Sequence, residues 1–389
     1  MSTKTIFSQS RLQSDKKVEN TKQDASSIRP VWFHSLINNE QRGFGATLVR
    51  SMLAAIEKPY SMVVRCRNYC FNTGLFPAHP IDVPVLSVGN LTLGGTGKTP
   101  MVAWLAGWLE NHAVRTAIVS RGYGGNDGHW NDEALELHQR LPSIPHIQNR
   151  NRVLGAKQAI AQHQTEVIVL DDAFQHRRIA RNLDIVLIDA LAPFGYEREF
   201  PRGLLREPLQ GLSRAHVVAL SRADAVGTSE RAEIQQRVQA IAPGAIWLET
   251  IHAPQHWQST TGKTIDLSQL AGASVAMFCG IGNPEGFRHT LKMARVQVVG
   301  EQTFPDHHQF TDQNMHTLDR WVRQLGPLDA VVCTHKDLVK LSASHIAGCP
   351  LYALMIGLEI TQGQKAFEQE LEKIITLVSN NKPQSHTMV

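Results

Sequence analysis

The stretch that decides the fold is Ser87-Val-Gly-Asn-Leu-Thr-Leu-Gly-Gly-Thr-Gly-Lys-Thr-Pro100. An apolar run at 83–88 precedes it and a helical pattern at 100–112 follows it, which predicts a strand, a glycine-rich turn and a helix. Backbone N–H groups in such a turn point at phosphate oxygens, and the helix N-terminus adds a partial positive charge. The sequence therefore predicts a P-loop in which Lys98 holds nucleotide phosphates and the Thr99 hydroxyl reaches Mg²⁺.

The loop departs from the general P-loop pattern at Thr92, where a glycine is usual. Gly94 and Gly95 must then provide the backbone flexibility that a glycine at position 92 would usually provide. The residues expected to surround the phosphates are Thr92, Leu93, Gly94, Gly95, Thr96, Gly97, Lys98 and Thr99.

An acidic motif further along the chain complements the P-loop. The apolar run at 167–170 ends in two carboxylates, Asp171 and Asp172. A P-loop needs an acidic residue at the end of another strand to hold Mg²⁺. We expect Asp171 or Asp172 to bind the metal, directly or through water.

Short apolar runs alternate with helical stretches along most of the chain, which predicts parallel strands joined by crossover helices. The fold class is therefore α/β, a P-loop type of three-layer, mostly parallel sheet with a second, smaller C-terminal α/β lobe. The expected segments are a disordered extension at 1–40, an N-terminal helical segment at 41–76, the P-loop core at 77–250, a connector at 251–268, the C-terminal lobe at 269–375 and a tail at 376–389.

Composition narrows the class of protein. Of the 389 residues, 42% are hydrophobic and 19% are charged, which is typical of a folded globular chain. The net charge is only +4 and no run packs five or six basic residues together, so nucleic acid is not an expected partner. The five scattered cysteines favour reduced thiols over a disulfide framework.

The segment at 44–74 has its own pattern. Its apolar residues recur at helical spacing and basic residues punctuate them, but no apolar run approaches the roughly 20 residues that span a bilayer. The pattern favours a basic, amphipathic helix pair lying on an anionic membrane surface, and an ordinary core helix is the alternative. The apolar positions are Phe44, Leu48, Met52, Ile56, Tyr60 and Val63, and the basic ones are Arg50, Lys58, Arg65 and Arg67.

Several motifs in one order resemble a known family. They are Gly89-Asn-Leu-Thr-x-Gly-Gly-x-Gly-Lys-Thr-Pro100, Ser120-Arg-Gly-Tyr-Gly-Gly125, Asp132-Glu133, Asp171-Asp-x-x-Gln-His176, Gly203-x-x-Arg-Glu207, Phe304-Pro-Asp-His307 and Thr334-x-Lys-Asp337. Over about residues 45–375, the chain is similar to the tetraacyldisaccharide 4′-kinases.

This resemblance implies a function. The γ-phosphate of ATP would pass, with Mg²⁺, to the 4′-hydroxyl of an acylated glucosamine disaccharide 1-phosphate, giving lipid IVA in lipid A biosynthesis. It also implies an N-terminal helix at the cytoplasmic face of the inner membrane, either spanning it or lying in the interface.

The resemblance also assigns roles to three residues. Asp132 would be the catalytic base, Glu133 a ligand on the magnesium side, and His307 the partner that orients Asp132. The chain departs from the family at Asn131, where a glycine normally precedes the acidic pair.

Four further residues suit the substrate. Guanidinium groups fit phosphate oxygens, so Arg152 and Arg206 are candidates for the acceptor's 1-phosphate or for the transferring phosphate. Gln175 and His176 follow the metal carboxylates and could orient water or substrate.

Two motifs resemble segments that contact the base in nucleotide-binding proteins: Ser221-Arg-Ala-Asp224 and Thr334-His-Lys-Asp337. At least one of them must be structural. Two other functions remain open at this point, a membrane-tethered P-loop NTPase switch with water as the acceptor and a nucleotide-binding regulatory module. A kinase needs a base on the acceptor side, which the other two do not.

Overall fold

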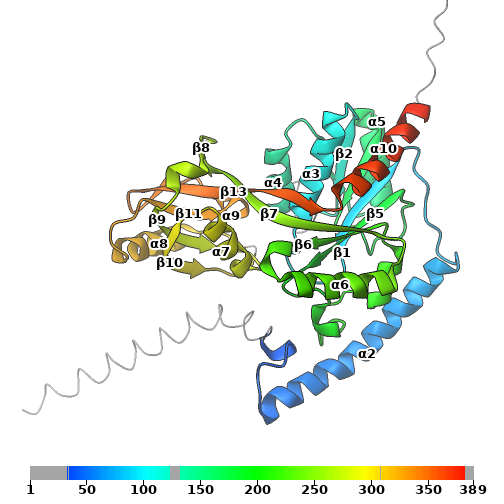
Figure 1. The fold of residues 1–389 in the computed structure, drawn as a ribbon, viewed down its shortest axis with the longest axis horizontal. Coiled ribbons are helices and arrows are strands. Elements are labelled where there is room, and N and C mark those ends of the chain that lie inside the picture. The colour runs from blue at the N-terminus through cyan, green and yellow to red at the C-terminus, as the bar shows by residue number, and fades with distance from the viewer. Residues whose placement is uncertain (1–32, 34, 123–131, 307, 382–389) are drawn as a thin grey trace, which may run out of the picture.

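The computed structural model describes residues 33, 35–122, 132–306 and 308–381, which form two lobes around one continuous sheet (Figure 1). In the described residues the main path of the sheet is β10-β9-β11-β13-β7-β6-β5-β1-β4-β2-β3, with β12 and β8 paired at its side. The strands are β1 (Val85–Asn90), β2 (Thr116–Ser120), β3 (His146–Gln148), β4 (Val167–Asp171), β5 (Leu183–Asp189), β6 (Val217–Ser221), β7 (Ile246–Ser259), β8 (Thr264–Asp266), β9 (Ser274–Cys279), β10 (Gln297–Thr303), β11 (Ala330–Thr334), β12 (His345–Ile346) and β13 (Cys349–Gln362).

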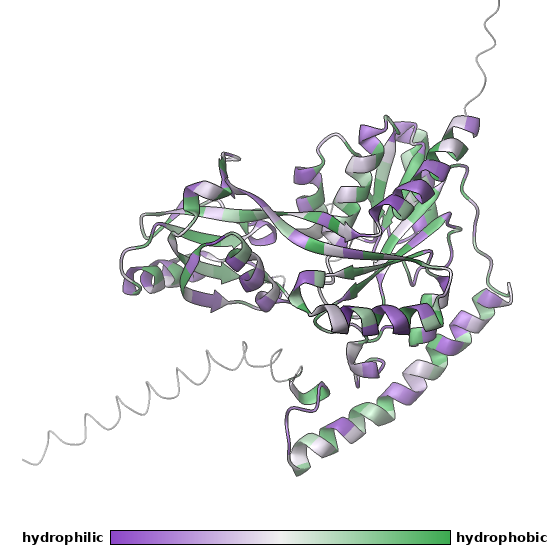
Figure 2. Cartoon of the chain, in the orientation of Figure 1, coloured by the Kyte–Doolittle hydropathy of each residue, from purple (hydrophilic) through white to green (hydrophobic). Residues whose placement is uncertain are grey.

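Most of the described helices lie on the two faces of this sheet, while the long helix α2 (Phe44–Asn72) runs along the outside of the first lobe (Figure 1). The others are α3 (Lys98–Asn111), α4 (Asp132–Arg140), α5 (Arg152–His163), α6 (Thr228–Ile241), α7 (Pro284–Met293), α8 (Asp312–Gln324), α9 (His335–Leu338) and α10 (Gln364–Asn381). Apolar residues concentrate in the strands, while the outer helices alternate between polar and apolar positions (Figure 2).

The first lobe is a parallel sheet with β1 near its centre. β1 pairs with β4 on one side and with β5 on the other. Apolar side chains of α3, α4 and α10 pack on one face, and those of α5 and α6 pack on the other. This arrangement confirms the predicted three-layer α/β class and brings the end of β1 to the middle of the carboxyl edge, where α/β proteins bind ligands.

The second lobe is smaller and has the same layering. β10, β9, β11 and β13 are parallel, with α7 packed on one face and α8 on the other. Two long strands, β7 and β13, join it to the first lobe as an antiparallel ribbon (Figure 1). The polar region expected as a connector at 251–268 is therefore the outer half of β7 followed by β8 and a short turn of helix.

The structure differs from the expected segments at both ends. Leu36 and Ile37, within the segment expected as an extension, are fully buried, and the Ile37 carbonyl accepts a hydrogen bond from Arg202 Nη1 at 2.9 Å. At the other end, α10 runs past residue 375 and returns to the first lobe, where Phe367 stacks on Trp104 with ring centroids 5.5 Å apart.

The N-terminal segment is one helix of 29 residues, not the expected pair, and it contains Pro59. Its outer face is apolar and exposed, with Phe44 87% and Met52 59% accessible to solvent. Tyr60, grouped with that apolar set by sequence, instead turns inward and is half-buried. Within the described residues, no helix has the length and apolar character needed to cross a membrane.

Candidate active site

The glycine-rich loop has the backbone of a phosphate cradle. All six residues of β1 are buried, and α3 begins at Lys98. Gly97 precedes it with φ of 84°, in the left-handed region that favours glycine. A Cβ atom at this position would lie 2.5 Å from His252 Nε2, so a larger residue would collide with the neighbouring strand β7.

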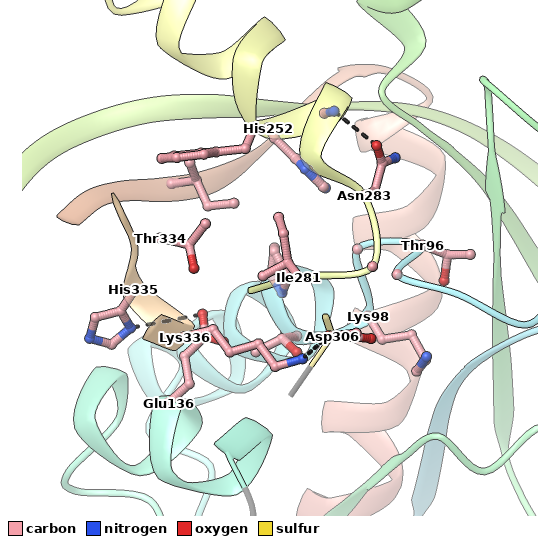
Figure 3. Close-up of a pocket in the computed structure, with 18 of the residues that line it drawn as sticks. Thr96, Lys98, Glu136, His252, Ile281, Asn283, Asp306, Thr334, His335 and Lys336 are labelled. Carbon is pink, nitrogen blue, oxygen red and sulfur yellow. Dashed lines mark hydrogen bonds and ion pairs between the residues drawn. The ribbon is translucent and has the colours of Figure 1, made fainter. Parts of the chain in front are cut away.

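Several features of the loop fit a nucleotide phosphate. The Thr96 hydroxyl is buried, and no hydrogen-bond partner reaches it in the part of the chain that the structure describes. The space beside Gly94 and Gly95 is open. A buried polar atom is normally satisfied, so an acceptor from outside the chain is expected here. Thr96 and Lys98 lie on one wall of the cleft in Figure 3.

Lys98 faces the acidic motif. Its Nζ atom lies 3.7 Å from Asp172 Oδ1, and Arg206 Nη1 donates to both Asp172 oxygens at 2.8 and 3.1 Å. Burial alone raises the pKa of Asp172, but Lys98 and Arg206 outweigh burial and hold that pKa below its usual value. The carboxylate is therefore ionised at neutral pH.

The two aspartates differ in position. Asp172 has a φ of 48° and lines the cleft, whereas Asp171 ends β4, is 97% buried and lines neither pocket. Among the described residues, no group of three or more His, Cys, Asp or Glu side chains could hold a metal. Mg²⁺ in nucleotide sites commonly takes one or two carboxylates together with phosphates and water, so Asp172 and Thr99 suit such a site.

The two lobes enclose a cleft of about 1120 Å³ (Figure 3). The P-loop forms one wall, and the loops that follow β9 and β11 form the facing wall. Lys336 Nζ donates to Asp306 Oδ1 at 3.0 Å on that wall, and Asn283 caps α7 through Gly286 N at 2.9 Å. The cleft is large enough for a bound nucleotide.

A second pocket of about 630 Å³ adjoins the first, and Asp172 and Arg206 line both. Arg152, Arg206, Gln175 and His176, the four residues expected at the substrate, all line it. Its other lining residues are Tyr60, Val64, Arg67, Leu93, Arg121, Arg150 and Glu207. From sequence, Leu93 was expected at the nucleotide phosphates and Tyr60 and Arg67 on a membrane-facing helix, whereas Val64 and Arg150 were not expected at any site.

The second pocket is strongly basic. Burial lowers the pKa of Arg152 to about 10, a value that still leaves the side chain charged at neutral pH. Burial and the nearby arginines lower the pKa of His176 to about 4, so its imidazole is neutral. Within the described residues, Arg152 Nε, Arg206 Nε and His176 Nε2 are buried without hydrogen-bond partners. A pocket of this charge with unmet donors suits an anionic ligand.

The structure does not describe the side chains of the expected base, Asp132, and of its expected partner, His307. Asp132 is the first residue of α4, and Leu135 and Glu136 of that helix line the cleft. The side chains of Asp132 and Glu133, and the whole of His307, lie outside the described residues.

The two motifs that resemble base-contacting segments have different surroundings. Asp337 is fully buried and accepts hydrogen bonds from Gly280 N at 3.0 Å and Thr334 Oγ1 at 2.6 Å. These bonds join the ends of β9 and β11. Asp224 lies 2.5 Å from His289 Nε2 and links the first lobe to α7.

Ser221 and Arg222, which belong to a motif expected from sequence at the nucleotide base, lie behind the P-loop instead. Arg222 Nη2 donates to the Gly95 carbonyl at 3.0 Å, and its Nε donates to Asp189 Oδ1 at 2.9 Å. Ser221 Oγ lies 3.3 Å from His252 Nε2 beside the same loop. Their place at strand ends could have indicated this. Asp189 ends β5, which pairs with β1, and Ser221 ends β6, which pairs with β5, so both lie on the carboxyl edge near the P-loop.

A P-loop lysine beside a carboxylate at the end of the neighbouring strand places the chain among the P-loop nucleotide-binding proteins. A profile of the family described as Tetraacyldisaccharide-1-P 4′-kinase matches residues 49–376. The chain therefore belongs to the tetraacyldisaccharide 4′-kinase family.

Individual relatives agree with this assignment. The chain is 35% identical over 311 residues to the tetraacyldisaccharide 4′-kinase of Desulfotalea psychrophila, covering 76% of this chain and 88% of that one. It is 33% identical over 377 residues to the same enzyme of Anaeromyxobacter sp. strain K, covering 92% and 98%. Its structure is similar to the "apo" form of LpxK from Aquifex aeolicus in complex with ATP, with a TM-score of 0.65 and 26% identity over 85% of this chain and 99% of that one.

Proposed function

We propose that this protein transfers the γ-phosphate of ATP to the 4′-hydroxyl of a tetraacyldisaccharide 1-phosphate. Membership of the family supports the reaction. The observation that carries the proposal is the junction at Asp172 and Arg206, where the cleft beside the P-loop meets the basic pocket. A donor and an anionic acceptor bound in these two pockets would approach each other at that junction.

On the donor side, the backbone of the loop at 94–97 and the ammonium of Lys98 bind and align the phosphates. Thr92 and Leu93, expected at the phosphates from sequence, do not line the cleft; Leu93 lines the second pocket, and its N–H donates to the Leu204 carbonyl at 2.8 Å. Thr99, Asp172 and Glu133 would hold Mg²⁺, with Asp171 behind them. The metal, when bound, neutralises charge on the phosphates. Phosphoryl transfer depends mainly on alignment and charge neutralisation, and these residues are suited to both.

On the acceptor side, Arg152 and Arg206 hold phosphate oxygens through their guanidinium groups. Arg206 is placed for the transferring phosphate, because it also contacts Asp172. Arg152 lies deeper and suits the acceptor's own 1-phosphate. Gln175 and His176 orient the sugar, since a neutral imidazole can donate or accept a hydrogen bond.

Proton removal from the 4′-hydroxyl is assigned to Asp132, with His307 orienting it. The family motif supports this assignment. A base on the acceptor side distinguishes a kinase from an NTPase switch, which needs only to position water.

Membrane attachment is assigned to α2. Phe44, Leu48, Met52, Ile56 and Val63 form its exposed apolar face, each more than half accessible. An exposed apolar face of this length marks a membrane or protein contact, and the acylated substrate favours the membrane. The inner membrane's cytoplasmic face is the proposed location. Replacing Leu48 and Met52 together by serine should lower recovery with anionic phospholipid vesicles.

One experiment tests the reaction. The purified chain is given ATP labelled in the γ-phosphate and Mg²⁺, with and without tetraacyldisaccharide 1-phosphate in mixed micelles. Transfer of label to the lipid, dependent on the acceptor, is the expected result. Equal release of inorganic phosphate with and without the lipid, with none on the lipid, would identify an NTPase and overturn the proposal.

A further inference from the structure

Helix α2 has a second face, opposite the apolar one, that makes specific polar contacts with the first lobe. Tyr60 Oη donates to the Arg206 carbonyl at 2.8 Å. Burial and Glu199 raise the pKa of Tyr60, so the hydroxyl keeps its proton at neutral pH. The ring of Tyr60 also packs edge to face on Phe200, with centroids 5.9 Å apart.

The contact at Tyr60 is the first of three that lead to the P-loop. Arg206 accepts the Tyr60 hydrogen bond at its backbone carbonyl. Its side-chain Nη1 atom donates to both oxygens of the Asp172 carboxylate, at 2.8 and 3.1 Å. Asp172 in turn lies 3.7 Å from Lys98 Nζ. A shift of α2 therefore moves the residue that is shared by both pockets.

A second route runs through Glu207, which is only 1% exposed. Its carboxylate accepts hydrogen bonds from Asn68 Nδ2 at 2.8 Å, from Gln175 Nε2 at 3.2 Å and from Arg214 Nη2 at 2.9 and 3.0 Å. A buried carboxylate needs all such partners, because an unmet charge away from water is costly. Asn68 thus fixes the carboxylate that orients Gln175.

Arg67 reinforces this route. Its Nη2 atom donates to the Gln175 carbonyl at 2.5 Å, and its guanidinium lies over the Phe71 ring at 5.3 Å. Gln175 is therefore held at its backbone by one residue of α2 and at its side chain by the carboxylate that another residue of α2 contacts.

We infer that the inner face of α2 is a positioning element of the acceptor site, in which Tyr60 and Asn68 set the places of Arg206 and Gln175. The inference rests on the proposed function of the second pocket. The helix then has two separable roles: its outer face contacts the membrane, and its inner face places the side chains that receive the acceptor. A helix that served as an anchor alone would need no such contacts.

Asn68 offers the sharper test, because it lines neither pocket and its side-chain amide donates to Glu207. Tyr60→Phe removes one hydroxyl and keeps the ring, and Asn68→Ala removes one donor. Tyr69→Phe is the matched control, since Tyr69 lies on the same helix and is 63% exposed. We measure kcat and KM for the lipid in mixed micelles, the Kd for ATP, vesicle recovery and thermal stability.

Each inner-face variant is expected to lower kcat/KM for the lipid about threefold to tenfold, the range that one lost hydrogen bond supports. The Kd for ATP and vesicle recovery should match the wild type, as should every value for Tyr69→Phe. Asn68→Asp should be worse than Asn68→Ala, because it sets a second carboxylate against Glu207. If the Asn68 side chain only filled space, Asn68→Asp would not be worse than Asn68→Ala.

Two outcomes overturn the inference. One is unchanged kcat/KM in both Tyr60→Phe and Asn68→Ala. The other is a parallel loss of ATP binding, vesicle recovery and turnover, which would show that α2 supports the fold as a whole. If the wild type fails to phosphorylate the lipid, the proposed function fails instead, and the two failures are distinguishable.

Discussion

Arg222 donates from Nη2 to the Gly95 carbonyl oxygen at 3.0 Å, across 127 residues of sequence. Its other contact is the Asp189 carboxylate, so one buried guanidinium ties the P-loop to the end of β5. The end of β5, a strand that lines neither pocket, therefore helps to shape the loop.

Arg222→Lys should raise the KM for ATP about tenfold and change kcat less, because a single ammonium cannot make both contacts and the loop loosens. Steady-state kinetics with varied ATP measures this effect. Arg237→Lys is the control, since its pair with Glu197 lies at the surface. A KM for ATP equal to that of the wild type would show that the loop holds its shape without Arg222.

Lys98→Ala should lower kcat by about 10²–10³, since one electrostatic clamp on the phosphates is lost. The side chain packs in no core cluster, so the melting temperature should change little. Phosphate transfer to the lipid and a thermal melt measure the two. Lys157→Ala, an exposed change on α5, is the control. Near-normal turnover in folded Lys98→Ala would contradict the assignment of the P-loop.

Asp172→Asn should raise the Mg²⁺ concentration needed for half the maximal rate more than Asp171→Asn does. The reason is that Asp172 lines the cleft and Asp171 does not. Titration of each variant with Mg²⁺, after removal of metal with a chelator, measures this difference. The reverse order would assign direct metal contact to Asp171.

His252 should make stability depend on pH. Burial, and then Arg222 and Arg140, lower its pKa from 6.5 to about 3. Between these values the unfolded chain binds a proton that the folded chain does not, so stability falls as pH drops below about 6.5. This histidine alone contributes about 1.4 kcal/mol per pH unit. Denaturant unfolding of His252→Gln should show a shallower slope from pH 6 to 4 than the wild type, and parallel curves above pH 7.5. Equal slopes throughout would mean that His252 takes up its proton in the folded state.

Asp132 and His307 should act as one unit if one takes the proton and the other orients it. Asp132→Ala and His307→Ala should each lower kcat strongly, and the double variant should be little worse than the more damaged of the two single variants. ATP binding should survive in all three, which equilibrium binding measures. A loss in the double variant equal to the product of the two singles would give His307 an independent role.

Local signals were sufficient for much of the fold. The apolar runs at 217–221, 274–279 and 330–334 predict strands, and β6, β9 and β11 begin and end at those residues, because each is a buried apolar run with a polar residue or turn at its end. The ribbon of β7 and β13 was harder to foresee. Its alternating polar positions at 251–259 satisfy a partner about 100 residues away, and pairing over such a separation leaves no periodic mark on one strand alone.

The candidate site divides in the same way. Lys98 and Asp172 belong to motifs whose spacing reflects the chemistry, so sequence reasoning identified both. Arg222 and Glu207 stand in motifs that the sequence analysis quotes, but their roles, like that of Asn68, depend on contacts between distant segments that the spacing of a motif does not show. Arg67 was noted as a possible contact for lipid headgroups, yet in the structure it lies against Gln175.

The return of α10 to the first lobe has a consequence for synthesis. Phe367, Leu371, Ile374 and Val378 complete the apolar cluster around α3, the helix that begins at the P-loop. A ribosome delivers the chain from its N-terminus, and domains commonly fold as they emerge. Here the nucleotide-binding lobe has to wait, with one side of α3 uncovered, until α10 has been made. The lobe that is translated first is therefore completed last, and a chain released before α10 would have its P-loop sequence intact and its core unfinished.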